Sequence, residues 1–368
     1  MLLSAAGTVD YLRARGLGAA PARAGAPWQV QEASSRNRNF AVLPADGEPG
    51  WFVKQLRVTA PASVLMMQRE ATVYWLANHE PDFAPMQALV PDLVLFDGAA
   101  RILVLALLPK ASNLMVDPAT RGHSAVVTAE RLGLALATLH HAVGRKTSSD
   151  PPPVFPREVP GIFTAHRGGP LVQWLGPGQR RLVERVCSHP RLPTTLDRLA
   201  ASWTFDSFVH GDVKLENCVA SYAAPAGAAS GPEVKLVDWE LADFGDACWD
   251  LGCTLQAYLY VCVRTSLGET GLDLGARLAA AGAQAAAMRD ALGAFWRRYC
   301  AGRGLDREAR AALLERTMGC AAARLLQMAL EVMHGQAEPP SIALSLFEAS
   351  DEVAGRPLEA AGLLGLLE

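Results

Sequence analysis

Short apolar runs with the spacing of β-strands dominate the first hundred positions of the chain. Residues 28–31, 39–43 and 51–55 have the length and the aromatic or β-branched content of strands. A Ser-, Asn- and Arg-rich stretch and the turn-forming pair Asp46-Gly47 separate them. We therefore predict an antiparallel arrangement of these three strands.

Two further runs follow at 89–96 and 101–108, joined by a turn at Asp97-Gly98. Residues 102–108 are apolar throughout, which is typical of a strand buried on both faces. Before these runs, residues 66–76 carry apolar side chains at helical spacing. The N-terminal part is therefore predicted to be a β-sheet with one associated helix.

Helical periodicity dominates the rest of the chain, with one interruption. Residues 218–222 and 234–237 read as two strands around an Ala-, Gly- and Pro-rich loop. A chain of 368 residues is too long for one compact core, so we expect two lobes or two domains. The predicted helical segments are 128–140, 255–263, 274–300 and 307–333.

Composition limits the classes of binding partner and the cellular compartment that we expect for this chain. Lys plus Arg number 34 against 37 Asp plus Glu, so the net charge of −3 gives no basic surface for nucleic acid or an anionic membrane. The seven cysteines are odd in number and lack a close pair, which predicts reduced thiols without a disulfide framework or zinc site. The apolar runs are shorter than the ~20 residues that cross a bilayer. We expect a soluble, cytoplasmic protein.

Two polar motifs carry the candidate chemistry. The first is His210-Gly211-Asp212, with Asn217 five positions after the aspartate, and the second is Asp238 at the end of an apolar run. Phosphoryl transfer needs a carboxylate to orient the attacking hydroxyl, and further oxygen ligands to hold Mg²⁺ on the nucleotide phosphates. Asp212 fits the first role, while Asn217 and Asp238 fit the second. A single His-Gly-Asp turn would be an ordinary loop, but the ordered pair favours a kinase.

This pair of motifs resembles the aminoglycoside phosphotransferase and choline kinase family, whose members have a protein-kinase-like fold. The resemblance implies a bilobal α+β protein with an antiparallel N-lobe sheet over residues 1–108 and a mostly helical C-lobe over 109–368. It also implies ATP and Mg²⁺ as cofactors, Asp212 as the catalytic base, and Asn217 and Asp238 as metal ligands. The helical C-terminal part would build the acceptor pocket.

The N-terminal lobe offers candidate nucleotide ligands. Lys54 lies on the third predicted strand and Glu70 on the helix that follows, as in the lysine–glutamate pair that kinases place against the α- and β-phosphates. The turn containing Ser35 and Asn37 resembles the phosphate-facing turn of the family. Lys54 could instead be a solvated edge charge, and the turn could be a plain hairpin loop.

The residues around the catalytic loop refine these expectations. Lys214, two positions after Asp212, is typical of Ser/Thr protein kinases, where it contacts the transferred phosphate; the alternative is a solvated loop lysine. Asp250 resembles the family aspartate that caps the next helix and holds the loop. We predict a structural role for His140 and regard Asp243-Phe244-Gly245 as a chance match to a protein-kinase motif.

We therefore predict an ATP- and Mg²⁺-dependent kinase acting on an alcohol hydroxyl of a small molecule, similar to an aminoglycoside or an amino alcohol. One alternative acceptor is a Ser or Thr of a natural-product precursor peptide, with a partner lyase. An alternative of another class is a nucleotide-binding pseudokinase scaffold. No nucleic-acid or membrane partner is expected. The sequence leaves the acceptor, the choice of ATP or GTP and the oligomeric state open.

Overall fold

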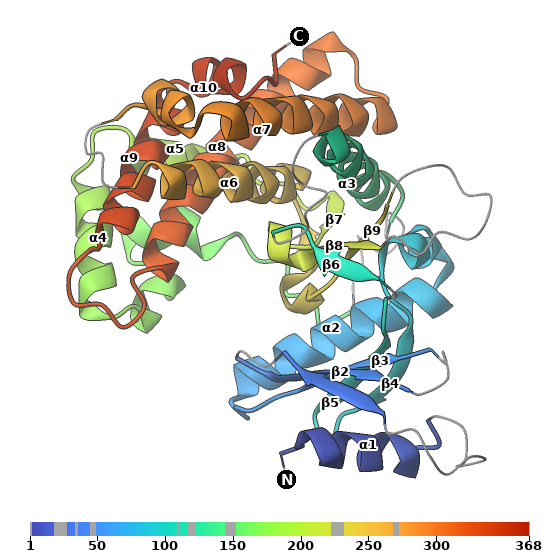
Figure 1. Ribbon diagram of the computed structural model, residues 1–368. Coiled ribbons are helices and arrows are strands. Elements are labelled where there is room, and N and C mark those ends of the chain that lie inside the picture. The colour runs from blue at the N-terminus through green and yellow to red at the C-terminus, as the bar shows by residue number, and fades with distance from the viewer. Residues whose placement is uncertain are drawn as a thin grey trace.

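The computed structural model describes residues 2–17, 28–33, 36–44, 49–108, 110–115, 123–143, 152–221, 232–267 and 272–367. A smaller lobe built around a β-sheet runs from helix α1 (Ala5–Ala14) to strand β5 (Ile102–Ala106), and a larger helical lobe follows (Figure 1). This is the predicted bilobal α+β architecture. The exact boundary at 108/109 stays a prediction, since Pro109 lies outside the described residues.

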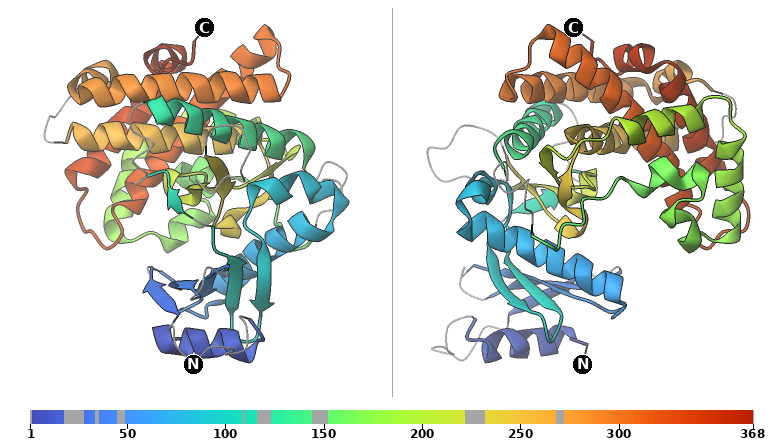
Figure 2. Two further views of the ribbon diagram at one scale, coloured as in Figure 1. Left: turned by 45° about the vertical axis from the view of Figure 1, so that its right-hand side comes forward. Right: turned by 180° about the vertical axis from the view of Figure 1, so that it is seen from behind.

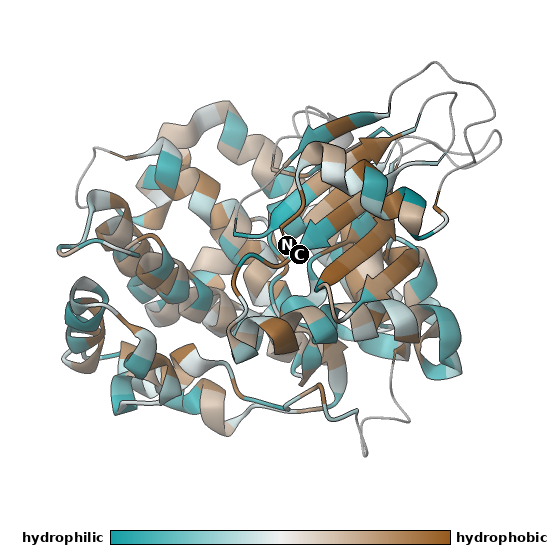
Figure 3. Ribbon diagram, turned by 90° about the horizontal axis from the view of Figure 1, so that it is seen from below, coloured by the Kyte–Doolittle hydropathy of each residue, from teal (hydrophilic) through white to brown (hydrophobic). Residues whose placement is uncertain are grey.

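Five antiparallel strands form the sheet of the smaller lobe, in the order β1-β2-β3-β5-β4. The apolar character of these strands is visible from the sheet side of the molecule (Figure 3). The strands are β1 (Gln29–Glu32), β2 (Arg38–Leu43), β3 (Trp51–Gln55), β4 (Leu93–Asp97) and β5 (Ile102–Ala106).

Alternation along β3 decides which helix each side chain meets, because successive side chains of a strand point to opposite faces. Trp51 and Val53 belong to the apolar cluster under α1. Phe52 packs into the main core on the other face, which helix α2 (Pro61–His79) covers. Lys54 therefore also faces α2, directly opposite Leu103 of β5. The lobe thus has three layers, α1, sheet and α2, with α2 nearest the helical lobe (Figure 2).

The helical lobe surrounds two small antiparallel sheets that carry the motif segments. Strand β7 (Ser207–Val209) pairs with β10 (Asp243–Gly245), and β8 (Cys218–Ser221) lies between β6 (Ala111–Asn113) and β9 (Glu233–Leu236). The helices are α3 (His123–Ala142), α4 (Pro177–Cys187), α5 (Leu192–Ala201), α6 (Ala247–Thr265), α7 (Leu274–Gly302), α8 (Arg307–Glu331), α9 (Ser341–Gly355) and α10 (Pro357–Leu363).

Most predicted elements are present, and two predicted strands are shorter than expected. The run 101–108 forms a strand only over Ile102–Ala106. The run 89–96 forms a strand only from Leu93, because Pro91 has no N–H for a ladder and the segment Pro81–Leu89 is a 3-10 helix. The three-residue β6 was not predicted. All seven cysteines are free, and all but Cys187 are buried, as expected. Among the described residues, no helix combines the length and apolarity needed to span a bilayer.

Candidate active site

A buried ion pair links the sheet to α2. Lys54 Nζ donates to Glu70 Oε2 at 2.7 Å, and the two side chains are 8% and 3% exposed. Lys54 also forms an ion pair with Asp238, which arrives from the helical lobe directly after β9. The alternative of a solvated edge lysine is therefore wrong, since Lys54 lies between two carboxylates at the junction of the lobes.

Charge and burial oppose each other in this cluster. Burial disfavours the ammonium form of Lys54, but Glu70 and Asp238 outweigh it and raise the lysine pKa. For Glu70 burial is the larger effect, and it raises the pKa to about 7 although Lys54 acts against it. Burial also acts on Asp238, yet Lys54 holds its pKa below the ordinary value. Lys54 is therefore a fixed cation, with one buried and one partly exposed acid beside it.

Asp212 lies in a loop whose backbone is shaped by Gly211. Gly211 has a φ of +83°, and a Cβ there would come within 2.3 Å of the carbonyl oxygen of Leu241. Any other residue would therefore displace one of two backbone segments. Oδ2 of Asp212 accepts hydrogen bonds from Lys214 Nζ at 2.7 Å and from Asn217 Nδ2 at 3.2 Å. Lys214 thus contacts the candidate base, while its side chain stays 35% exposed, so its role in the reaction stays a prediction.

Sequence reasoning missed Arg324, which reaches the same carboxylate from helix α8. Its Nη2 lies 3.2 Å from Asp212 Oδ1, and its side chain is only 2% exposed. Burial disfavours the charged form of Asp212, but Arg324 and Lys214 outweigh it and lower its pKa. The signal in the sequence was a charged residue enclosed by Ala321, Ala322, Ala323, Leu325 and Leu326 in a helical stretch.

A second aspartate, Asp250, binds the backbone of the loop that carries Asp212. The Asp250 carboxylate accepts the backbone N–H groups of His210 at 2.7 Å and Gly211 at 2.9 Å. His140 donates from Nε2 to the same carboxylate at 3.1 Å, and its Nδ1 lies 3.0 Å from the Tyr299 hydroxyl, so it is a buried structural histidine as predicted. The prediction that Asp250 caps the helix was wrong, because Asp246 is the N-cap of α6 and accepts from Cys248 N.

Asn217 and Asp238, the predicted metal ligands, are brought together by the β8–β9 pair. Val237, the neighbour of Asp238, donates its backbone N–H to the Asn217 carbonyl at 3.0 Å. Asp238 has a φ of +68°, a left-handed conformation that is uncommon outside glycine and turns the chain at the end of β9. One carboxylate and one amide oxygen suit Mg²⁺, which keeps several waters and takes further oxygens from nucleotide phosphates. The donor set therefore fits the predicted ion.

The predicted phosphate turn is only partly described. Ser35 lies outside the described residues, while Asn37 is buried, at 7% exposed, just before β2. The residue between them, Arg36, forms an ion pair with Glu240, two positions after Asp238. Arg69 of α2 donates to the Glu240 carbonyl at 3.2 Å. The turn and α2 therefore both contact the segment that carries Asp238.

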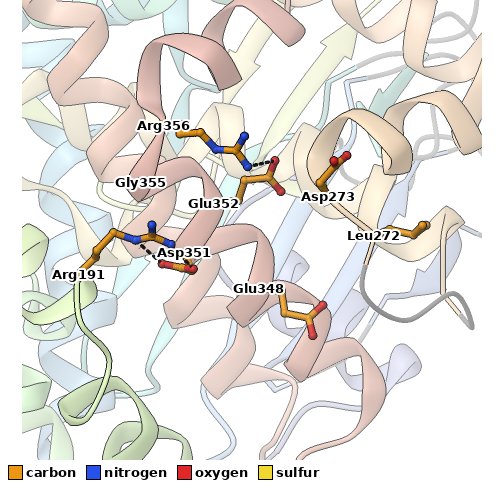
Figure 4. A pocket seen from close by; sticks show the side chains of 8 residues that line it. All are labelled: Arg191, Leu272, Asp273, Glu348, Asp351, Glu352, Gly355 and Arg356. Atoms are coloured by element: carbon orange, nitrogen blue, oxygen red, sulfur yellow. Dashed lines mark hydrogen bonds and ion pairs between the residues drawn. The ribbon is translucent and has the colours of Figure 1, made fainter.

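Other sequence features lie outside this cluster. Asp243 accepts the backbone N–H groups of Arg157 and Glu158, each at 3.0 Å, which gives it a structural role. A pocket of about 430 Å³ between α5, α7 and α9 contains none of the residues described above (Figure 4). It is lined by Arg191, Leu272, Asp273, Glu348, Asp351, Glu352, Gly355 and Arg356.

A sheet lobe with a Lys–Glu pair, joined to a helical lobe with an Asp-containing loop, is the organisation of a kinase-like phosphotransferase. The chain belongs to the phosphotransferase enzyme family named APH, whose model matches residues 29–300. The predicted family, fold class and kind of enzyme are thereby confirmed. No curated protein matches the sequence significantly.

Solved structures of low sequence identity share the fold. A choline/ethanolamine kinase family protein from Mesorhizobium loti is 17% identical, with a TM-score of 0.54, covering 97% of this chain and 98% of the other. An ethanolamine kinase from Plasmodium vivax is 9% identical, with a TM-score of 0.54 and coverage of 90% and 83%. Aminoglycoside 2'-phosphotransferase-IIIa, solved with GDP, is 11% identical, with a TM-score of 0.51 and coverage of 96% and 100%.

Proposed function

We propose that this protein is an ATP- and Mg²⁺-dependent kinase that transfers the γ-phosphoryl group to the alcohol hydroxyl of a small molecule. The observation that carries the proposal is the meeting of Lys54, Glu70 and Asp238 beside a loop that presents Asp212 and Asn217. Membership of the phosphotransferase family supports the reaction type.

In this proposal each residue acts on a different part of the reaction. Lys54, held by Glu70, binds the α- and β-phosphates, and the turn with Ser35 and Asn37 covers them. Asn217 and Asp238 hold Mg²⁺, which offsets charge on the phosphate oxygens when bound. Asp212 orients the acceptor hydroxyl and receives its proton at a carboxylate oxygen.

Lys214 supplies the positive charge nearest to the transferred group. It is 35% exposed while its partner Asp212 is 15% exposed, so its ammonium can turn from Asp212 toward an incoming phosphate. A cation at that position offsets the charge that develops as the phosphoryl group leaves ADP. Lys214 therefore serves the phosphoryl group, and Asp212 serves the hydroxyl.

The acceptor class rests on the relatives. Structural neighbours are described as choline/ethanolamine, ethanolamine and aminopropanol kinases and as an aminoglycoside phosphotransferase. These support a small alcohol that also carries an amine. The peptide alternative rests on Lys214 alone, and no described feature adds a partner lyase. The pseudokinase alternative conflicts with the complete set of candidate ligands.

The test is a transfer assay with MgATP against ethanolamine, choline, 1-amino-2-propanol and kanamycin, with a Ser/Thr peptide as comparison. We expect phosphorylation of at least one amino-alcohol or aminoglycoside acceptor. Thermal stabilisation by ATP is measured in parallel with Mg²⁺ and with EDTA, since a ligand that binds the folded state raises Tm. Equal stabilisation in EDTA, together with no transfer to any acceptor, would support the pseudokinase scaffold instead.

A further inference from the structure

The candidate base is held from two sides by cations of different origin. Lys214 and Asn217, on the catalytic loop itself, contact Oδ2 of Asp212. Arg324, more than one hundred positions later on α8, contacts Oδ1 at 3.2 Å. The two carboxylate oxygens therefore have separate partners, and only Arg324 comes from outside the loop among the residues that the structure describes.

Arg324 is itself fixed in place. Its Nη1 lies 3.5 Å from Glu331 Oε1, which also accepts from Gln327 at 3.0 Å. Its guanidinium carbon lies 5.6 Å from the ring centroid of Trp249, and the indole N–H of Trp249 donates to the Gly211 carbonyl at 2.9 Å. Helix α8 thus contacts the catalytic loop at Asp212, and the start of α6 contacts it at the adjacent Gly211.

The Arg324 side chain is a poor choice for stability alone. It is 2% exposed, and its Nε is buried without a hydrogen-bond partner among the described residues. Replacing both partners of a buried ion pair by apolar residues of similar volume is often neutral or stabilising, so stability does not require a buried guanidinium with an unpaired N–H at this position. The guanidinium leaves its buried Nε–H unpaired within the described part of the chain, and its contact with Asp212 indicates that it acts on that carboxylate.

Lys214 and Arg324 differ in exposure, and this difference indicates different roles. Lys214 is 35% exposed and can leave Asp212 when a phosphate arrives, whereas Arg324 is enclosed and stays. Without Arg324, the Asp212 side chain would then be held, among the described residues, only at Oδ2, by the 3.2 Å hydrogen bond from Asn217. Misplacement of a reacting group by about 1 Å can cost on the order of 100-fold in rate.

We propose that Arg324 is a positioning residue that fixes Oδ1 of Asp212, so that the carboxylate keeps one orientation toward the acceptor hydroxyl during phosphoryl transfer. This inference rests on the proposed function. It adds a residue on α8 to a site otherwise formed by the sheet lobe and the β7–β9 segments, and it predicts an effect on turnover without an effect on nucleotide binding.

The experiment compares Arg324→Met with Arg277→Met in the full chain. Arg277 is a matched control, since it is 1% exposed and pairs with Glu348 at 3.0 Å, but it contacts none of the proposed site residues. Rates are measured for the acceptor that the wild-type enzyme phosphorylates fastest, and for MgATP hydrolysis, in which water replaces the alcohol. Nucleotide binding and thermal stability are measured on the same samples.

We expect Arg324→Met to lower kcat on the order of 100-fold, with nucleotide affinity within about twofold of wild type. Arg277→Met should lose stability and keep kcat. Arg324→Lys, which restores a cation, should recover part of the rate and serves as the test if the methionine variant does not fold.

Three outcomes are distinguishable. A kcat within about twofold of wild type in Arg324→Met, or in Arg324→Lys if only that variant folds, would overturn the inference while leaving the proposed function intact. A loss of nucleotide affinity that matches the loss of rate would also overturn it, because the role would then be structural. A wild-type enzyme with neither transfer nor hydrolysis would contradict the proposed function, and this inference with it.

Discussion

The two charged clusters at the junction of the lobes are built in opposite ways. At Lys54 one buried cation lies between two carboxylates, Glu70 and Asp238. At Asp212 one carboxylate lies between two cations, Lys214 and Arg324. The first cluster has an excess of negative charge and suits a divalent cation, while in the second the partly exposed Lys214 can turn toward an anionic phosphoryl group. The contrast teaches that neighbouring ion networks can prepare one site for ligands of opposite sign.

The largest expected effect comes from removing the single carboxylate of the second cluster. Asp212→Ala should lower the transfer rate on the order of 1,000-fold, because proton transfer to a positioned base contributes ~10²–10⁴-fold. Nucleotide affinity should change little, since Lys54, Asn217 and Asp238 remain. Transfer kinetics and nucleotide titration check this, and turnover close to wild type would remove Asp212 from its proposed role.

Removing the cation of the first cluster should act on stability as well as on binding. Lys54→Met leaves Glu70 buried without its partner, and breaking a buried ion pair from one side costs about 3 kcal/mol or more. The double variant Lys54→Met/Glu70→Gln should be more stable than Lys54→Met, because the unpaired charge is gone. Urea unfolding above pH 7, where Glu70 of the wild type is ionised, measures the difference. Equal stabilities would mean that Glu70 takes up a proton once Lys54 is removed.

Gly211 tests how the loop between the clusters is held. Gly211→Ala places a Cβ 2.3 Å from the Leu241 carbonyl oxygen at a φ of +83°. We expect a loss of about 2 kcal/mol of stability, within the range for backbone strain of this kind. The transfer rate should fall too, since Asp212 is the next residue. Gly304→Ala is a suitable control, because its φ is also positive but a Cβ there would meet nothing within 4 Å.

The smallest expected effect is a pH dependence of stability at His140, which contacts the aspartate that holds the catalytic loop. Burial lowers the pKa of His140 below 6.5, although Asp250 acts against it. The unfolded chain therefore binds a proton that the folded chain does not, so the free energy of unfolding should fall as the pH drops below 6.5. His140→Gln should weaken this dependence. Urea unfolding at about pH 7.5 and about pH 5.5 measures it, and identical pH profiles for both proteins would contradict it.

The elements that carry the site could be predicted because local pattern decides them. The run 51–55 has the aromatic and β-branched content of a strand, and Lys54 on it faces α2 by simple alternation. The catalytic loop was recognisable because Asp212, Asn217 and Asp238 stand at fixed spacings around strands. Their roles remain predictions; the structure joins the Asp212 and Asn217 side chains by a hydrogen bond, and a backbone hydrogen bond from Val237 to Asn217 brings Asp238 near them.

Contacts between distant segments could not be predicted in the same way. Arg324 reaches Asp212 only because α8 packs beside α6, and no local pattern encodes that pairing. The ion pair of Arg36 with Glu240 joins the two lobes in a similar manner. The cap at Asp246 was misassigned to Asp250 because both acids precede or begin the same helix, and only the fold shows which one meets its N-terminus.

The most direct test concerns the two proposed metal ligands, Asn217 and Asp238. Binding of Mn²⁺ in a ternary complex with ADP can be followed by electron paramagnetic resonance in wild type, Asn217→Ala and Asp238→Asn. We expect tight ternary binding in wild type and a loss on the order of 10- to 100-fold in each variant, because Asn217→Ala removes an oxygen ligand and Asp238→Asn removes the negative charge of a ligand. Equal Mn²⁺ affinity in all three proteins would contradict the proposal that Asn217 and Asp238 hold the metal ion beside Asp212.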